Sequence, residues 1–193
     1  MNVVIVGGVA AGMSAASKLR RMCSEARIIV FEKGLDVSYG ACGLPYFISG
    51  ENDNADLMRI RTAAQFRKQG IDVRLRHEVF GVDPAARRVA VRDLETGVTF
   101  TVPYDKLVIA TGASPVRPPV PGVELPGVVT LKSIPDAEAI KALLAAPATQ
   151  DVLIVGSGFI GLEMAEACVR LGKRVRVLEM QERVLPVYEP EIS

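Results

Sequence analysis

The chain has 193 residues, which is room for one ordinary domain or two small ones. Its 23 basic and 22 acidic residues nearly cancel and form no block of one sign, so no nucleic-acid or anionic-lipid partner is expected. Hydrophobic residues make up 49% and only three cysteines are present, which excludes a disordered chain and a disulfide-stapled domain and leaves no Cys-x-x-Cys metal site. We expect a folded cytoplasmic α/β protein that binds no metal. The uncharged amino-terminal stretch is shorter than the roughly 20 residues that a membrane span needs, so it predicts a strand, a glycine-rich turn and a helix.

An internal repeat organises the chain. Residues 3–12, VVIVGGVAAG, recur as residues 152–161, VLIVGSGFIG. In each copy a buried strand runs into a glycine turn, a helical stretch follows, and a second apolar run ends in an acid, Glu32 or Glu179. Strand–helix–strand units of this kind build parallel sheets covered by helices. Two separate nucleotide sites are therefore predicted.

The residues between the two copies are of a different kind. From Ile71 to Val102 apolar and polar residues alternate on either side of a turn, which predicts an inserted antiparallel hairpin. Residues 107–112 predict one more buried strand with a glycine turn. Five prolines between Ala113 and Gly127 exclude a helix or a central strand there. We expect a first nucleotide-binding domain at 1–112, a proline-rich crossover at 113–127, and a second, incomplete domain at 128–193.

The second copy carries the more regular nucleotide fingerprint. Gly156, Gly158 and Gly161 fit G-x-G-x-x-G between a strand and a helix: they permit a tight turn, close approach of a pyrophosphate, and close helix–strand packing, respectively. Glu179 can accept both hydroxyls of a ribose and would repel a 2′-phosphate, so NADH is expected more than NADPH. Three nearby cations can soften this preference: Arg174, Arg176 and Arg183.

The first copy is less regular. Gly7, Gly12 and Glu32 are in place, but Val9 occupies the position of the close-approach glycine. Two such fingerprints in one chain are typical of a flavoprotein with FAD at the amino-terminal site. The predicted fold is therefore α/β, with two Rossmann-like dinucleotide-binding domains.

Cys42 follows the second predicted strand within residues 37–46, VSYGACGLPY. Gly43 and Pro45 fit a turn that opens a helix, and the peptide dipoles at a helix N-terminus stabilise a thiolate. Cys42 is therefore the candidate redox thiol. Cys23 and Cys168 fall on amphipathic helices and are expected to be structural.

These motifs together resemble the pyridine nucleotide-disulfide oxidoreductases. The similarity is to the single-cysteine branch, which contains coenzyme A-disulfide reductases, NADH oxidases and peroxidases, and persulfide reductases. It covers all 193 residues and rests on five segments: 6–12, 31–33, 38–46, 110–112 and 156–161. Val9 matches the coenzyme A-disulfide reductase-like members, and Ala10 replaces the histidine of the peroxidase-like members.

The resemblance implies a role for each matching residue. It places FAD against Gly7, Val9, Ala10, Gly12, Glu32, Lys33, Val79, Thr111 and Gly112. It places the nicotinamide coenzyme against Gly156, Gly158, Phe159, Ile160, Gly161, Glu163 and Glu179, with Phe159 as the aromatic residue that covers the flavin. Coenzyme A would contact Ser14, Lys18, Arg21 and Ser38 and form a mixed disulfide with Cys42. Ser14, Lys18 and Arg21 also fall on one helical face, where two cations suit phosphates or simply a solvated helix end.

The expected activity is electron transfer from NAD(P)H through FAD and Cys42 to a coenzyme A disulfide, a persulfide or a similar small disulfide. Three alternatives stay open: an NADH oxidase or peroxidase using a cysteine sulfenic acid, a nucleotide-binding redox module without turnover, and a cysteine-independent flavin reductase that serves a ferredoxin. The resemblance also implies a longer, homodimeric enzyme. We expect these 193 residues alone to bind FAD weakly and to lack full activity.

Overall fold

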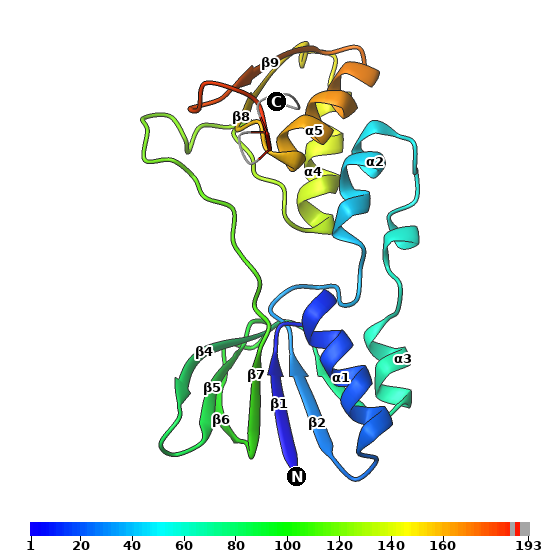
Figure 1. The fold of residues 1–193 in the computed structure, drawn as a ribbon, viewed down its shortest axis with the longest axis vertical. Helices are drawn as coiled ribbons and strands as arrows, with labels where there is room; N and C mark the ends of the chain where they lie inside the picture. Colours follow the sequence, from blue (N-terminus) through cyan, green and yellow to red (C-terminus); the bar gives the residue numbers. More distant parts are fainter. Residues whose placement is uncertain (186–187, 190–193) are drawn as a thin grey trace. The chain divides into compact units, whose positions relative to one another are not determined.

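The computed structural model describes residues 1–185, 188 and 189, and the chain forms two compact units. Unit 1 contains Met1–Gly40 and Arg59–Ala113, and unit 2 contains Ala41–Met58 and the chain from Ser114 onward (Figure 1). The chain therefore leaves unit 1 after Gly40 and returns to it at Arg59.

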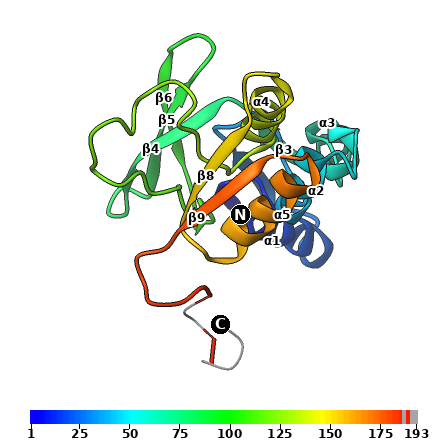
Figure 2. The same cartoon turned by 90° about the horizontal axis from the view of Figure 1, so that it is seen from above.

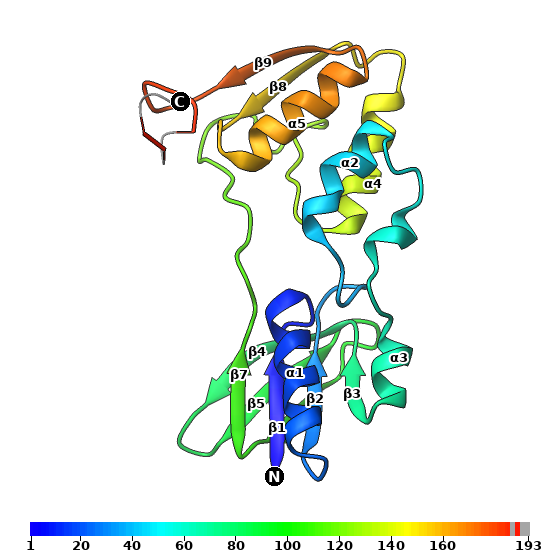
Figure 3. The ribbon, with the colours of Figure 1, turned by 45° about the vertical axis from the view of Figure 1, so that its right-hand side comes forward.

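The centre of unit 1 is a parallel sheet with the strand order β3-β2-β1-β7. Its strands are β1 (Asn2–Val6), β2 (Arg27–Phe31), β3 (Ile71–Arg74) and β7 (Lys106–Ile109). Two helices cover one face, α1 (Ala10–Met22) and α3 (Ala63–Lys68) (Figure 3). Val3 and Ile5 of β1 pack on the helix side, whereas Val4 and Val6 face the other way, as the two-residue period of a strand requires. The predicted parallel sheet is confirmed for unit 1, but the prediction that helices cover it holds for one face only.

A second, antiparallel sheet covers the other face of the parallel sheet. Its strands are β4 (His77–Asp83), β5 (Arg88–Asp93) and β6 (Thr99–Pro103), in that order. Val89 and Val91 of β5 are fully buried against the parallel sheet. The inserted element is thus larger than the predicted hairpin, and the prediction that it begins at Ile71 is wrong. Ile71 belongs to β3, where it pairs with Ile28 in the parallel sheet.

Unit 2 contains the second strand–helix–strand copy. The parallel strands β8 (Asp151–Val155) and β9 (Arg174–Leu178) run side by side (Figure 2), and α5 (Phe159–Arg170) packs against one face of them. Leu153 and Val155 on the opposite face are exposed. Helix α4 (Ile134–Ala145) precedes this copy, and residues 113–127 form neither a helix nor a strand. No described helix is long and apolar enough to cross a membrane.

The segment Ala41–Met58 joins unit 2 through α2 (Leu44–Ser49). Helix α2 packs against α4 and α5 and buries the ring of Phe47, over which the ammonium of Lys141 lies at 4.3 Å. Arg170 of α5 forms an ion pair with Glu51 at 3.3 Å. Because of these contacts, Ala41–Met58 belongs to the carboxyl-terminal unit although it lies within the first 112 residues. The order of residues along the chain does not indicate this grouping.

Candidate functional site

The first glycine turn connects β1 to α1. Gly7 adopts a positive φ of 102°, and its N–H donates to the carbonyl of Phe31 at 2.8 Å. A Cβ on Gly7 would lie 2.2 Å from the carbonyl oxygen of Ala110, and one on Gly12 would lie 1.8 Å from the carbonyl oxygen of Gly7. No side chain is possible at either position. The turn is therefore held close to β2, to the end of β7 and to its own helix.

The second turn repeats this geometry between β8 and α5. Gly156 has a φ of 100° and donates its N–H to the carbonyl of Leu178 at 2.8 Å, and a Cβ on Gly161 would lie 2.0 Å from the carbonyl oxygen of Gly156. A Cβ on Gly158, in contrast, would have nothing within 4 Å. The protein itself gives no reason for a glycine at position 158, and the open space beside it suits an approaching phosphate.

An acid holds each turn. The Glu32 carboxylate accepts the N–H of Gly8 at 2.6 Å and that of Gly34 at 2.7 Å. The Glu179 carboxylate accepts the N–H and the hydroxyl of Ser157 at 2.8 and 2.7 Å and the N–H of Gln181 at 2.9 Å. The hydrogen bond from Gln181, followed by those from Ser157, lowers the pKa of Glu179 from 4.5 to about 2. Its carboxylate is therefore ionised at neutral pH.

The helices behind the two turns have no side-chain cap. Neither α1 nor α5 has a capping side chain or an acid in its first turn. By contrast, α3 and α4 begin with complete capping boxes, Thr62 with Gln65 and Ser133 with Asp136. The free N–H groups at a helix start form an anion site when no side chain takes them. Both glycine turns therefore offer backbone donors to a pyrophosphate.

The other residues assigned to the first turn lie in different surroundings. Val9 is half-buried beside the start of α1, and Ala10 and Lys33 are exposed. Thr111 and Gly112 are exposed just after β7, next to the Ala110 carbonyl that abuts Gly7. Val79 of β4 packs in the core between the two sheets and pairs with Val91. Two residues earlier, the backbone N–H of His77 donates to the backbone carbonyl of Glu32 at 2.9 Å. Val9 and Ala10 belong to the turn and to the start of its helix. Of the residues distant in the sequence, the structure brings Thr111, which Gly112 follows, to the turn.

In unit 2 the predicted nicotinamide-side residues are open to solvent. The side chain of Phe159 is 56% exposed and meets Tyr188 edge to face at 5.7 Å, and Ile160 and Glu163 are exposed on α5. Arg174 forms an ion pair with Asp151 at 2.6 Å, at the end of the strands that lies away from the glycine turn.

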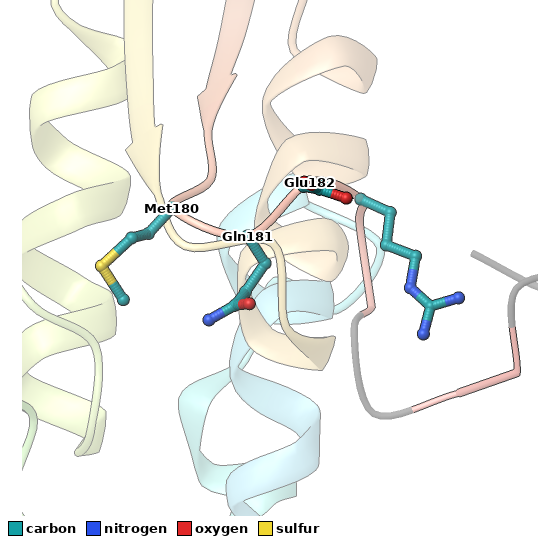
Figure 4. Close-up of a pocket in the computed structure, with 4 residues that line it drawn as sticks. Met180, Gln181 and Glu182 are labelled. Atoms are coloured by element: carbon teal, nitrogen blue, oxygen red, sulfur yellow. The ribbon is translucent and has the colours of Figure 1, made fainter.

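The chain after Glu179 lines an open depression of about 470 Å³ that sequence reasoning missed. Figure 4 shows the four residues that line it: Met180, Gln181, Glu182 and Arg183. The one signal for this depression in the sequence was that its four residues directly follow Glu179, the acid expected to bind a ribose. Of the three predicted cations, Arg183 lines this depression, whereas Arg176 is exposed on β9.

The residues assigned to coenzyme A fall into two groups. Ser14, Lys18 and Arg21 are all exposed on α1, as their helical spacing predicted. Ser38 is half-buried, has a positive φ of 51°, and donates its N–H to the carbonyl of Gly8 at 2.9 Å. Ser38 is therefore fixed directly on the first glycine turn.

The three cysteines differ in exposure. Cys42 is exposed in a short 3₁₀ helix, Ala41–Gly43, directly before α2, which confirms that a helix opens here. Cys23 is half-buried at the end of α1. Cys168 is buried in α5, and burial raises the pKa of its thiol. Cys42 is thus the thiol with the freest access to a small molecule. No cluster of metal-ligating side chains occurs within residues 1–185, 188 and 189.

The two units share a strand, a glycine turn, a helix and a second strand that is followed by an acid. The model of the pyridine nucleotide-disulphide oxidoreductase family matches residues 1–193, and the chain belongs to that family. This confirms the family and the fold class that the sequence motifs indicated. The family implies FAD and NAD(P)H as cofactors.

Three known proteins show the range of the similarity. A "NAD(P)H sulfur oxidoreductase (CoA-dependent)" of Pyrococcus abyssi is 45% identical over 184 residues, which are 95% of this chain and 40% of the relative. An NAD-dependent persulfide reductase from A. fulgidus is 41% identical with a TM-score of 0.94, over 100% of this chain and 36% of that one. Reduced Bacillus anthracis CoADR-RHD is 33% identical with a TM-score of 0.95, over 99% of this chain and 35% of that one. This chain therefore spans two fifths or less of each of these proteins.

Proposed function

We propose that this chain is the coenzyme-binding and thiol-bearing part of an FAD-dependent NAD(P)H:disulfide oxidoreductase that reduces a coenzyme A disulfide, a persulfide or a similar small disulfide. The observation that carries the proposal is the backbone geometry that the two glycine turns share. Each has an uncapped helix and a carboxylate bound to its own backbone. Two dinucleotide sites in one chain are what transfer between a nicotinamide and a flavin requires.

The first turn fits FAD. Gly7 and Gly12 leave no room for side chains, the start of α1 offers free N–H groups, and Glu32 lies where a ribose diol would be accepted. When bound, FAD supplies two-electron chemistry between a hydride donor and a disulfide. The protein's part there is to hold the pyrophosphate on backbone donors and the ribose on a carboxylate.

The second turn fits the nicotinamide coenzyme. Gly158 leaves open space at the start of α5, and Glu179 is ionised at neutral pH. A fixed negative charge beside the ribose disfavours a 2′-phosphate, so NADH is the preferred donor in this proposal. Arg183 in the adjacent depression keeps some affinity for NADPH.

Cys42 is the proposed nucleophile. Its thiolate attacks one sulfur of the substrate disulfide, the S–S bond breaks, and one thiolate leaves while the other half stays bound to Cys42 as a mixed disulfide. One electron pair from NADH then breaks that bond and restores the Cys42 thiolate. The balance is NADH + H⁺ + RSSR giving NAD⁺ + 2 RSH. The second sulfur comes from the substrate, so no partner cysteine in the chain is needed.

The covalent chain limits how far Cys42 can lie from Ser38. Ser38 is bonded to the carbonyl of Gly8, and Tyr39 pairs with Arg59 where the segment 41–58 leaves and rejoins unit 1. The four residue steps from Ser38 to Cys42 can span at most about 14 Å. The exposed Lys18 and Arg21 of α1 then supply cations for the phosphates of coenzyme A.

The test is NADH-dependent reduction of coenzyme A disulfide by the purified holoenzyme without oxygen. Cys42→Ser is expected to lower disulfide turnover by more than about a hundredfold and to leave NADH oxidation by a one-electron dye unchanged. Cys23→Ser, which removes a half-buried thiol, is the matched control and should keep both activities. Full disulfide turnover by Cys42→Ser would refute the proposal. Turnover that needs oxygen or peroxide in place of the disulfide would select the oxidase or peroxidase alternative.

A further inference from the structure

The two glycine turns differ in one buried side chain. Gly8 in the first turn corresponds to Ser157 in the second. Both residues donate their N–H to the acid of their own unit, at 2.6 and 2.8 Å. Ser157 adds a second bond, because its hydroxyl donates to the same Glu179 oxygen at 2.7 Å. The hydroxyl-bearing residue is fully buried.

The first turn has no room for such a side chain. A Cβ on Gly8 would lie 2.7 Å from a methyl group of Val37 and 3.1 Å from the Cβ of Glu32. Glu32 is nevertheless fixed, by the N–H groups of Gly8 and Gly34 alone. The equivalent backbone donors in unit 2 are those of Ser157 and Gln181. The Ser157 hydroxyl is therefore not needed to orient the carboxylate of Glu179.

The Ser157 hydroxyl instead occupies one of the hydrogen-bond acceptor positions of the Glu179 carboxylate. A carboxylate offers about four lone-pair positions. Glu179 already accepts three hydrogen bonds, from the N–H and the hydroxyl of Ser157 and from the N–H of Gln181. A ribose diol brings two further donors. About one acceptor position is left on Glu179, so a diol with two donors needs a position that one of the present donors holds.

Only one of these donors can leave without moving the turn. The N–H groups belong to the backbone, whereas the hydroxyl rotates about a single bond. We propose that the Ser157 hydroxyl occupies a ribose-binding position on Glu179 in the free protein and is displaced when the nicotinamide coenzyme binds. This inference rests on the proposed function, because it assigns that coenzyme to the second turn. Ser157 is then a residue that lowers coenzyme affinity and acts through Glu179.

Removing the hydroxyl should strengthen binding, which is the opposite of what a purely structural serine would do. In the holoenzyme, Ser157→Ala is expected to lower the Kd and KM for NADH about three- to tenfold and to leave kcat unchanged. For an NADH analogue that lacks the adenosine 2′-hydroxyl, the gain should be smaller, because that analogue brings one donor fewer. Ser157→Gly, which installs the residue of the first turn, should give the same tightening and carries the test if the alanine variant does not fold. Ser24→Ala is the matched control, because the Ser24 hydroxyl also donates to a carboxylate, that of Glu25 at 3.2 Å, on the exposed surface of unit 1.

The outcomes separate the inference from the function on which it rests. Tighter NADH binding with unchanged kcat in both Ser157 variants supports the inference. The inference alone is overturned if the wild type binds NADH, the Glu179→Ala variant binds it more weakly, and neither Ser157 variant binds it more tightly. NADH affinity that is indifferent to Glu179→Ala overturns the assignment of the second turn, and the inference with it.

Discussion

The backbone N–H of Gly8 lies 2.6 Å from the carboxylate of Glu32, which ends the neighbouring strand. Unit 2 has the same bond from Ser157 to Glu179 at 2.8 Å. The acid after each second strand thus supports its glycine turn before any ligand arrives. Changing either acid is therefore expected to affect both the conformation of its glycine turn and the binding of the ligand.

Replacing Glu179 should change coenzyme preference. Glu179→Ala removes the charge that opposes a 2′-phosphate and leaves the cation of Arg183, which lines the depression formed by the residues after Glu179. We expect the ratio of kcat/KM for NADPH to that for NADH to rise about tenfold or more. Steady-state kinetics with both coenzymes measure this ratio, and Glu138→Ala on the exposed surface of α4 is the comparison variant. An unchanged ratio would contradict the proposed NADH preference.

The stabilisation contributed by Glu179 should depend on pH in a defined direction. Because its pKa is lowered from 4.5 to about 2 in the folded protein, the charged form is favoured by folding. The stabilisation is fully present above pH 4.5 and is lost as the pH falls towards 2. The difference in unfolding free energy between wild type and Glu179→Gln should therefore be constant above pH 4.5 and shrink below it. Chemical denaturation across this range is the measurement, and a difference that grows on acidification would rule the account out.

Two glycines of the second turn should respond differently to alanine. Gly161→Ala places a Cβ 2.0 Å from the Gly156 carbonyl and is expected to destabilise the protein by about 1–3 kcal/mol or to prevent folding. Gly158→Ala meets no protein atom within 4 Å, so its stability cost should stay below about 1 kcal/mol.

The added methyl of Gly158→Ala instead enters the space assigned to the pyrophosphate, and NADH affinity should fall about ten- to hundredfold. Thermal unfolding and NADH titration together test this pair. Normal NADH binding by a folded Gly158→Ala variant would show that the coenzyme lies elsewhere.

The three cysteines should react in a fixed order. In the reduced holoenzyme, iodoacetamide is expected to modify the exposed Cys42 first and the half-buried Cys23 more slowly. Cys168 should react last, because it is buried and its pKa is raised. Peptide mass spectrometry at timed intervals gives the order, and NADH-dependent disulfide turnover should fall in step with Cys42 alone. Modification of Cys168 at the rate of Cys42 would contradict the structure.

Arg20 and Arg21 should differ in their effect on stability although they are neighbours. The Arg20 guanidinium donates to the carbonyls of Ala26 at 2.7 Å and Gly70 at 2.6 Å, and also to the carbonyl of Ser24. Arg20→Met is expected to lower the unfolding free energy by about 1–3 kcal/mol. Arg21→Met on the exposed face should stay within about 0.5 kcal/mol of wild type. Urea denaturation of both variants is the test, and equal effects would contradict these assignments.

Local sequence patterns were sufficient to predict much of the fold. The β-branched runs at 3–6 and 152–155 predicted parallel strands, and the glycine spacing predicted turns that open helices. The predicted burial is correct for the first run but wrong for the second, where Leu153 and Val155 are exposed. Such features depend on residues within a few positions of each other, because steric limits on glycine and strand propensity act locally. The same reasoning placed Cys42 before a helix, and the structure agrees.

Some structural similarities between the two copies could not be predicted from the sequence. The repeat continues beyond the acids, because Leu185 donates its N–H to the Ser157 carbonyl at 3.2 Å, as Ser38 does to Gly8, and both have a positive φ. Apart from the acids themselves, only Val37 and Val184 match between residues 32–38 and 179–185. The backbone conformation is thus conserved between the copies where the side chains are not.

By itself, the sequence determined that the chain has two nucleotide turns, an inserted antiparallel element and one thiol in a helix-opening turn. Only the tertiary structure decided that Ile71 belongs to the parallel sheet, that the segment after Gly40 packs with unit 2, and that the Ser157 hydroxyl binds Glu179. The reason is physical: period and turn chemistry are set by neighbours along the chain. The partner of a strand edge, a helix face or a buried hydroxyl is set by which distant groups come within contact distance once the chain has folded.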